Sequence, residues 1–334
     1  MQRYGGSSSS AFDAFIYADP LRNSLMGVKR GFAGQDLLSM QDFSKEDILK
    51  VLSIAKKFVN KKHPKLLQGK ILGALFFEPS TRTRLSFESA MAKLGGQSIG
   101  FAGASVSSVT KGESLIDTIH MVEQYADLLV IRHPQEGAAR LAAEATNRPV
   151  INAGDGANQH PTQTLVDLFT IQQLLGRLDR LKIGIVGDLK YGRTVHSLIY
   201  GLSHFSSEIS LISPQSLKLP SAYRDILYRN RVRYHEYEDF LGQLPTLDVL
   251  YMTRIQKERF ADAAEYEKVR NAYVLTAAHL KRAKPNLKIL HPLPRVTEIS
   301  QDIDQTPHAA YFQQAGNGIP VRQAIIALLA GAVA

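Results

Sequence analysis

The spacing of apolar and polar positions predicts strands that alternate with helices along most of the chain. Helical spacing is clear at Phe87, Ala90, Met91 and Leu94, which recur at i, i+3, i+4 and i+7. Apolar runs of strand length lie at residues 71–77, 98–101, 128–131, 150–152, 182–186, 208–212, 232–236, 248–251 and 288–290. Such an alternation indicates βαβ units, and therefore parallel sheets.

Capping residues and apolar faces place the helices between these runs. Ser44 opens one helix with a capping-box pattern, and Gly95 ends the next. Pro161 suits the first position of another helix. The predicted helices cover residues 45–60, 82–94, 114–125, 137–144, 161–175, 222–230, 261–269, 276–283 and 320–329, and a further helix after Gly192 has Val195, Leu198, Ile199 and Leu202 on one face.

The alternation pauses at the helix of residues 161–175 and restarts after Gly176. A chain of 334 residues suits two domains of ordinary size. We therefore expect an α/β fold of two doubly wound parallel-sheet domains joined by a bridging helix. The expected parts are a flexible Gly/Ser-rich leader at 1–33, a first domain at 34–165 to which a C-terminal helix at 319–334 returns, and a second domain at 166–318.

Composition and charge narrow the function classes. The chain has no cysteine, which excludes disulfides, thiol catalysis and cysteine-ligated metal sites within it and is compatible with a cytoplasmic location. Its net charge of +9 favours an anionic partner, but no dense Lys/Arg block is interleaved with aromatic residues. The longest apolar run, 324–334, is too short to span a bilayer. We expect small anionic substrates rather than nucleic acid or a membrane.

The stretch Ser80-Thr81-Arg82-Thr83 lies where a predicted strand turns into a predicted helix. The first backbone N–H groups of a helix lack partners and form its positive end. Three hydroxyls and a guanidinium group at such a point indicate a site for phosphate or a similar dianion. The alternative is a simple helix cap by Ser80 or Thr81, followed by arginines that face solvent.

Ligands of parallel α/β sheets collect beyond the carboxyl ends of the strands. Arginine follows several of the predicted strands, at Arg82, Arg132, Arg193 and Arg254. Because arginine binds phosphate and carboxylate bidentately, this recurrence predicts a substrate with several negative groups. His160 follows another strand and could polarise a carbonyl oxygen, although a structural histidine is an equal alternative.

Two other kinds of site receive less support. Residues 187–194 (GDLKYGRT) approach the phosphate-loop pattern, but arginine stands in place of the lysine, and no GxGxxG occurs there, so nucleotide binding is disfavoured. Asp155, Asp167 and Asp188 are scattered along the chain, and we interpret them as structural. The sequence therefore predicts no metal site.

Seven motifs together resemble the catalytic chains of aspartate carbamoyltransferases. The similarity runs from about Gly34 to the C-terminus. The motifs are 76–84 (FFEPSTRTR), 110–113 (TKGE), 132–137 (RHPQEG), 158–163 (NQHPTQ), 188–197 (DLKYGRTVHS), 251–259 (YMTRIQKER) and 291–295 (HPLPR). The resemblance implies transfer of a carbamoyl group from carbamoyl phosphate to L-aspartate, an early step of pyrimidine synthesis, without a cofactor.

The resemblance also implies site residues. Those for carbamoyl phosphate are Ser80, Thr81, Arg82, Thr83, Arg132, His160 and Gln163. Thr83, Arg132 and His160 would face the carbamoyl oxygen as the catalytic group. The residues implied for aspartate are Lys111, Arg193, Arg254, Gln256, Leu293 and Pro294. Ser107 and Lys111 would reach the site of a neighbouring subunit, which implies a homotrimer, and a regulatory chain is a further candidate partner.

Two alternatives stay open at this point. An ornithine carbamoyltransferase shares the phosphate motif, but typically has a cysteine in the motif that here reads His291-Pro292-Leu293-Pro294. A non-catalytic anion-binding protein would need only residues 80–84 and would leave Arg254 without a role. The chain also departs from some family members at Thr110, where they carry a second basic residue.

Overall fold

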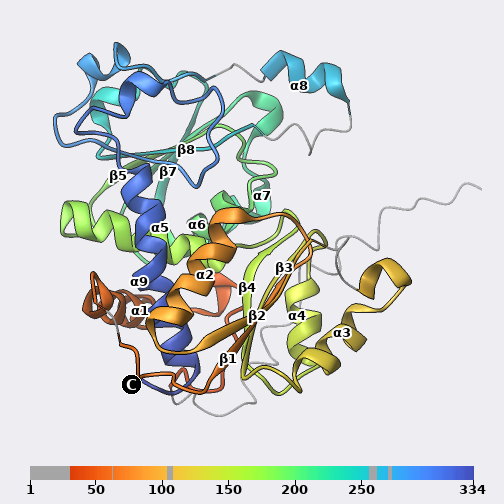
Figure 1. The fold of residues 1–334 in the computed structure, drawn as a ribbon. Coiled ribbons are helices and arrows are strands. Elements are labelled where there is room, and N and C mark those ends of the chain that lie inside the picture. Colours follow the sequence, from red (N-terminus) through yellow and green to blue (C-terminus); the bar gives the residue numbers. More distant parts are fainter. Residues whose placement is uncertain (1–30, 62, 104–107, 256–261, 270–272) are drawn as a thin grey trace, which may run out of the picture.

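The computed structural model describes residues 31–61, 63–103, 108–255, 262–269 and 273–334 (Figure 1). The predicted leader at 1–33 lies outside the described residues except for its last three positions. Within the described ranges, every named strand belongs to one of two parallel sheets.

The first sheet forms the lower lobe in Figure 1 and has the strand order β2-β1-β3-β4. Its strands pair in parallel because helices return the chain to the same edge each time. The strands are β1 (Ile71–Phe76), β2 (Gln97–Ala102), β3 (Leu128–His133) and β4 (Val150–Asp155). The helices of this part are α1 (Lys45–Phe58), α2 (Thr81–Lys93), α3 (Leu115–Val122) and α4 (Ala138–Glu144).

The second sheet forms the upper lobe and has the order β7-β6-β5-β8-β9, again all parallel. Its strands are β5 (Lys182–Val186), β6 (Glu208–Ile212), β7 (Arg233–Tyr237), β8 (Val249–Met252) and β9 (Lys288–Leu290). The associated helices are α6 (Arg193–Leu202), α7 (Ser221–Arg229) and α8 (Ala263–Val269).

Two long helices join the lobes. Helix α5 (Pro161–Leu175) follows the last strand of the first sheet and precedes the first strand of the second, as predicted for a bridge. Helix α9 (Tyr311–Leu329) returns to the first lobe and packs against α1, α2 and α5. One apolar cluster runs through Leu72, Leu168, Ile183 and Ile325, and so connects both sheets. The predicted fold class is confirmed.

Two helix predictions were wrong. The closing helix was predicted at 320–329, with Pro320 as its first residue, but α9 begins at Tyr311 and contains Pro320. Its first half carries Gly316 and Gly318, whose low helix propensity hid it. Residues 276–283 form only a short 3-10 turn, His279–Arg282. There the Thr276 N–H donates to His279 Nδ1 at 3.3 Å.

Candidate active site

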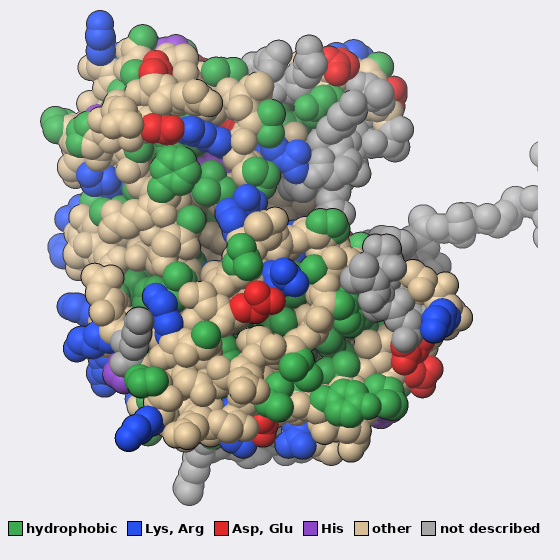
Figure 2. All heavy atoms as spheres, viewed as in Figure 1, with side chains coloured by type: hydrophobic (Ala, Val, Ile, Leu, Met, Phe, Trp, Pro, Cys, Tyr) green, Lys and Arg blue, Asp and Glu red, His purple; other side chains and the backbone are tan. Residues whose placement is uncertain are grey.

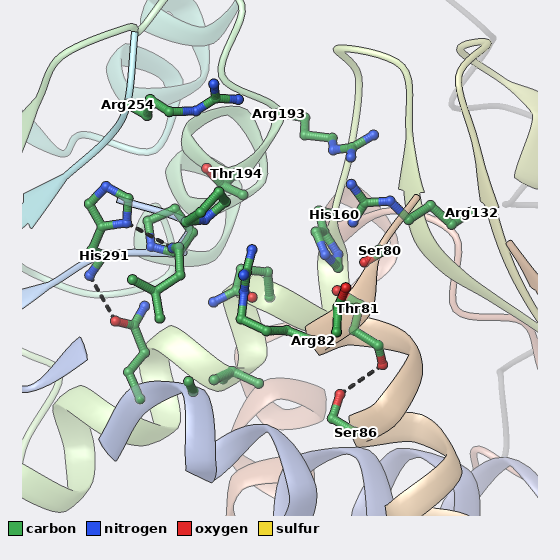
Figure 3. Close-up of a pocket in the computed structure, with 18 of the residues that line it drawn as sticks. Ser80, Thr81, Arg82, Ser86, Arg132, His160, Arg193, Thr194, Arg254 and His291 are labelled. Atoms are coloured by element: carbon green, nitrogen blue, oxygen red, sulfur yellow. Dashed lines mark hydrogen bonds between the residues drawn. The ribbon is translucent and has the colours of Figure 1, made fainter. Parts of the chain in front are cut away.

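The carboxyl ends of the two sheets face one another across a cavity of about 510 Å³. Figure 2 shows Lys and Arg side chains gathered around the hollow between the lobes. Figure 3 shows Ser80, Thr81, Arg82 and Arg132 on one side of the cavity and Arg254 on the other. The cavity is thus lined by cationic and polar groups from both halves of the chain.

The turn into α2 offers its hydroxyls to the cavity. Ser80 is the residue before the helix, yet its side chain makes no capping hydrogen bond. The cap alternative expected that bond, so a plain helix cap does not explain this residue. Ser80, Thr81 and Arg82 line the cavity beside the first turn of α2. Hydroxyls and a guanidinium group thus lie beside the first turn of a helix, where backbone N–H groups lack helical partners.

Glu78 lies between two of the predicted arginines. Its Oε1 accepts hydrogen bonds from Arg132 Nε at 2.7 Å and from Arg193 Nη2 at 2.5 Å, and Arg132 Nη2 forms an ion pair with the same oxygen at 2.7 Å. Burial alone would raise the pKa of Glu78, but the charges of Arg193 and Arg132 outweigh it, and the pKa lies below its usual value. Burial and the neighbouring Arg193 lower the pKa of Arg132 to about 10, so Arg132 stays cationic at neutral pH.

His160 sits at the start of α5 with 4% of its surface exposed. Its backbone N–H donates to Ser197 Oγ at 2.7 Å, which fixes this turn against α6. Burial, and then the charges of Arg132, Arg193 and Arg322, hold the pKa of the imidazole well below its ordinary value. A neutral imidazole can donate a hydrogen bond to a substrate oxygen. Because it carries no positive charge, it does not compete with the arginines for an anionic group.

The loop after β9 closes the cavity from the second lobe. His291 Nε2 hydrogen-bonds to Glu298 Oε1 at 2.7 Å, and the Leu293 N–H donates to His291 Nδ1 at 2.7 Å. The peptide bond between Leu293 and Pro294 is cis. These contacts hold the backbone of the loop beside Thr253 and Arg254, which follow β8.

The cavity brings together most of the predicted site residues. Those that line it are Ser80, Thr81, Arg82, Thr83, Arg132, His160, Gln163, Arg193, Arg254, Leu293 and Pro294. Lys111 is exposed in a short 3-10 turn, Ser108–Lys111, and does not line the cavity of its own chain. Ser107 and Gln256 lie outside the described residues.

Among the lining residues that sequence reasoning missed are Glu78, Gln314 and Arg322. Glu78 lies inside the phosphate motif. Its carboxylate close to Arg82 and Arg84 in the sequence was the signal that could have identified it. Gln314 lies in the first part of α9, which was not predicted, and no local pattern marks Arg322 within the predicted part of that helix. Asp167, interpreted as structural, accepts a hydrogen bond from the lining residue Gln163.

Metal and membrane features can be assessed for the described ranges. They contain no group of three or more His, Cys, Asp or Glu side chains that could hold a metal ion. Of the helices in those ranges, none combines the length and apolar character needed to cross a bilayer.

Comparison with known families decides the classification. Residues 35–173 match the model of the aspartate/ornithine carbamoyltransferase carbamoyl-P binding domain, and residues 179–329 match that of the Asp/Orn binding domain. The chain belongs to the aspartate/ornithine carbamoyltransferase family. A family member from Thermococcus onnurineus, an aspartate carbamoyltransferase catalytic subunit, is 59% identical over 302 residues, which are 89% of this chain and 97% of the relative.

Solved structures of the family share the fold. The catalytic subunit of M. jannaschii aspartate transcarbamoylase has a TM-score of 0.81 and 53% identity, and the match covers 88% of this chain and 97% of that one. Aspartate transcarbamoylase from Trypanosoma cruzi, in complex with carbamoyl phosphate and aspartate, has a TM-score of 0.84 and 38% identity over 89% of this chain and 97% of that one.

Proposed function

We propose that the chain transfers the carbamoyl group of carbamoyl phosphate to the amine of L-aspartate, giving N-carbamoyl-L-aspartate and phosphate. It is an aspartate carbamoyltransferase by family and by the identity of its relatives. The observation that carries the assignment is a single cavity with an anion site on one side and arginines on the other. We also propose that the reaction is an early step of pyrimidine synthesis, as the family resemblance implies, and that it takes place in the cytoplasm.

The two sides of the cavity suit the two substrates. We assign the phosphate of carbamoyl phosphate to Ser80, Thr81, Arg82 and Thr83, where hydroxyls and a helix N-terminus meet. The aspartate carboxylates are assigned to guanidinium groups from the second lobe. The residues of the aspartate side are Arg193, Arg254, Leu293 and Pro294, with Gln256 and the neighbour's Lys111 added by family resemblance.

The proposed catalysis is positioning plus electrostatics. Two anionic substrates repel each other, and the surrounding arginines offset that repulsion. As the amine attacks, the carbamoyl oxygen gains negative charge, which Thr83, Arg132 and neutral His160 would stabilise as an oxyanion hole. The C–N bond forms while the C–O bond to phosphate breaks. A phosphate oxygen can take the amine proton as it leaves, so no side chain is needed as the base.

The proposed domain division follows the two lobes. The carbamoyl phosphate domain would comprise 34–165 and the returning helix at 319–334, and the aspartate domain 166–318. The packing of α9 on α1 and α2 supports the assignment of the returning helix to the first domain. The two family models meet between residues 173 and 179, later than the proposed boundary, and the second model extends to residue 329.

A three-acceptor assay tests the function directly. Purified chain is given carbamoyl phosphate with L-aspartate, with L-ornithine or with no acceptor, and no metal is added. We expect carbamoyl-aspartate with aspartate alone. Turnover with ornithine alone would overturn the roles of Arg193 and Arg254. Binding of carbamoyl phosphate without turnover would favour the anion-binding alternative.

We further propose a homotrimer with shared active sites, because Lys111 is exposed and lies away from its own cavity. The test mixes Arg82→Ala chains with Lys111→Ala chains, each inactive alone. If sites form between neighbours, an equal random mixture should recover about a quarter of wild-type turnover. No recovery, despite exchange of subunits, would contradict shared sites.

A regulatory chain is a further candidate partner, and co-sedimentation of the chain with components of a cell extract would detect it.

A further inference from the structure

A buried carboxylate lies directly behind the carbamoyl side of the cavity. Asp167 is on α5, one turn after Gln163, and 0% of its surface is exposed. Its Oδ1 accepts hydrogen bonds from Gln163 Nε2 at 2.7 Å and from Gln314 Nε2 at 2.7 Å. Its Oδ2 accepts a hydrogen bond from the Tyr251 hydroxyl at 2.9 Å. One carboxylate therefore contacts α5, α9 and β8.

These contacts determine how the Gln163 amide is turned. A carboxylate can only accept, so Gln163 must present its NH₂ group to Asp167. The amide oxygen is then left for the cavity, which Gln163 lines. A carbamoyl group ends in an NH₂ that donates hydrogen bonds. An amide turned the other way would set donor against donor and would repel it.

The same logic continues into the loop that closes the cavity. Because Gln314 also presents its NH₂ group to Asp167, its oxygen is free to accept, and it does so from the His291 N–H at 2.8 Å. His291 in turn holds the Leu293 N–H through Nδ1. Asp167 thus connects the carbamoyl side of the cavity to the loop of the second lobe.

An ionised carboxylate at this depth is costly, and burial raises the pKa of Asp167 to about 6. Three donated hydrogen bonds and the charge of Arg322 oppose that rise. Arg322 is 4% exposed, lines the cavity and packs its guanidinium 5.0 Å from the centre of the Phe87 ring. If Asp167 had only a structural role, an apolar side chain could fill its position at a lower cost in folding free energy. The carboxylate therefore indicates a role for its hydrogen-bond acceptors.

We propose that Asp167 is a positioning residue for carbamoyl transfer. It holds the Gln163 amide with its oxygen toward the carbamoyl NH₂, and through Gln314 it holds the loop of His291 in the matching position. The proposal rests on the assignment of carbamoyl phosphate to this cavity.

Two substitutions separate hydrogen bonding from charge. Asp167→Leu removes the acceptor, whereas Asp167→Asn keeps an acceptor oxygen for the two glutamines and removes the charge. We expect kcat/KM for carbamoyl phosphate to fall about tenfold in Asp167→Leu, as for loss of one substrate hydrogen bond. Asp167→Asn should stay within about threefold of wild type. Equal losses in both, or none in Asp167→Leu, would overturn the proposal.

The inhibition constant of inorganic phosphate distinguishes a loss of positioning from a general loss of structure, because only the latter would change it. Phosphate lacks the carbamoyl NH₂, so this constant should stay within about twofold of wild type in both variants. Tyr251→Phe and Asp248→Asn serve as controls. The first removes the third hydrogen bond of Asp167 together with the hydroxyl's hydrogen bond to Thr194, and the second removes the charge of a 7% exposed carboxylate in the other lobe. Both should keep kcat/KM for carbamoyl phosphate. A matching loss in either control would overturn the proposal.

A double-mutant cycle shows whether Asp167 acts through Gln163. In a Gln163→Ala background, Asp167→Leu should cost little more, because the amide that it positions is gone. Additive losses would overturn the proposal. If Asp167→Leu does not fold, the test uses Gln163→Glu instead, which brings two carboxylates into contact. That variant should lose at least tenfold in kcat/KM, and added Asp167→Asn should restore part of it by returning a donor.

A double variant no better than Gln163→Glu would also contradict the proposal. All these results are ratios to wild type. A wild-type chain without carbamoyl transfer to any acceptor would instead contradict the proposed function, so the two failures are distinguishable.

Discussion

Glu78 and Arg193 come from different lobes and meet at 2.5 Å across the cavity. Glu78 follows β1, and Arg193 begins α6. Because Arg132 binds the same carboxylate oxygen, a single negative charge holds two cations in place. Without it, the two guanidinium groups would repel each other, and the fit between the lobes would lose a polar contact.

Glu78→Gln should therefore impair the aspartate side more than the phosphate side. We expect kcat/KM for aspartate to fall about tenfold, because Arg193 loses its charged partner and its fixed direction. Affinity for inorganic phosphate should stay equal or rise, since a negative charge leaves the cavity. Steady-state kinetics with phosphate inhibition measure both. Glu88→Gln, whose partner Arg84 lies outside the cavity, is the matched control. A loss confined to phosphate affinity would contradict this role.

Arg82→Ala should abolish most turnover while leaving the fold intact. Arg82 is exposed at the start of α2 and lines the cavity, so its loss removes a cation from the phosphate site and little packing. We expect kcat to fall about 10²–10³-fold, as for loss of one transition-state donor. Arg84→Ala, two residues along, removes an arginine outside the cavity and should retain activity. Near-normal turnover of Arg82→Ala would exclude the phosphate assignment.

His160 should be neutral throughout the pH range in which histidines usually titrate. Its pKa lies well below the ordinary value because of burial and three nearby arginine charges. Below about pH 6.5, His160 binds a proton in the unfolded chain but stays neutral in the folded chain. The contribution of His160 to the free energy of unfolding therefore falls as the pH drops below that value. NMR of ¹⁵N-labelled histidine, assigned with His160→Ala, should show a neutral ring at pH 6. An imidazolium signal there would contradict the prediction.

Gly187 should tolerate no side chain. It lies after β5 with φ +118°, and a Cβ there would stand 2.4 Å from the carbonyl oxygen of Thr253. Gly187→Ala should destabilise the chain by about 1–3 kcal/mol and displace the segment that carries Arg254. Gly316→Ala is the matched control, because its Cβ meets open space in α9 and should be neutral or stabilising. Thermal unfolding measures both, and equal unfolding temperatures would contradict the clash.

The sequence was most informative where structure is local. The turn from β1 into α2 is encoded in consecutive residues, so the place of Ser80 to Arg82 between a strand and a helix could be predicted, and these residues line the cavity. The proximity of the arginines that follow the strands could also be predicted, because the carboxyl ends of parallel strands lie at the same edge of a sheet. The bridging helix at Pro161–Leu175 was predicted with its observed bounds, since Pro161 and Gly176 mark both ends.

Interactions between distant segments could not be predicted. The partners of Glu78 are 54 and 115 positions away, and no periodicity reports such pairs. Asp167 seemed structural because its partner Gln314 is 147 positions away on a helix whose first half was not predicted. The start of α9 was missed because tertiary packing, rather than helix propensity, stabilises a segment with two glycines.

Calorimetric titration with N-(phosphonacetyl)-L-aspartic acid tests the central claim most directly. This molecule joins a phosphonate to an aspartyl group and is bound in a solved structure of the Trypanosoma cruzi relative. If one cavity holds both substrates, each chain should bind one molecule, and Arg82→Ala and Arg254→Ala should each weaken binding about 100-fold, as for loss of a charged contact. Binding that is unchanged in either variant would show that the phosphate side and the aspartate side do not form one site.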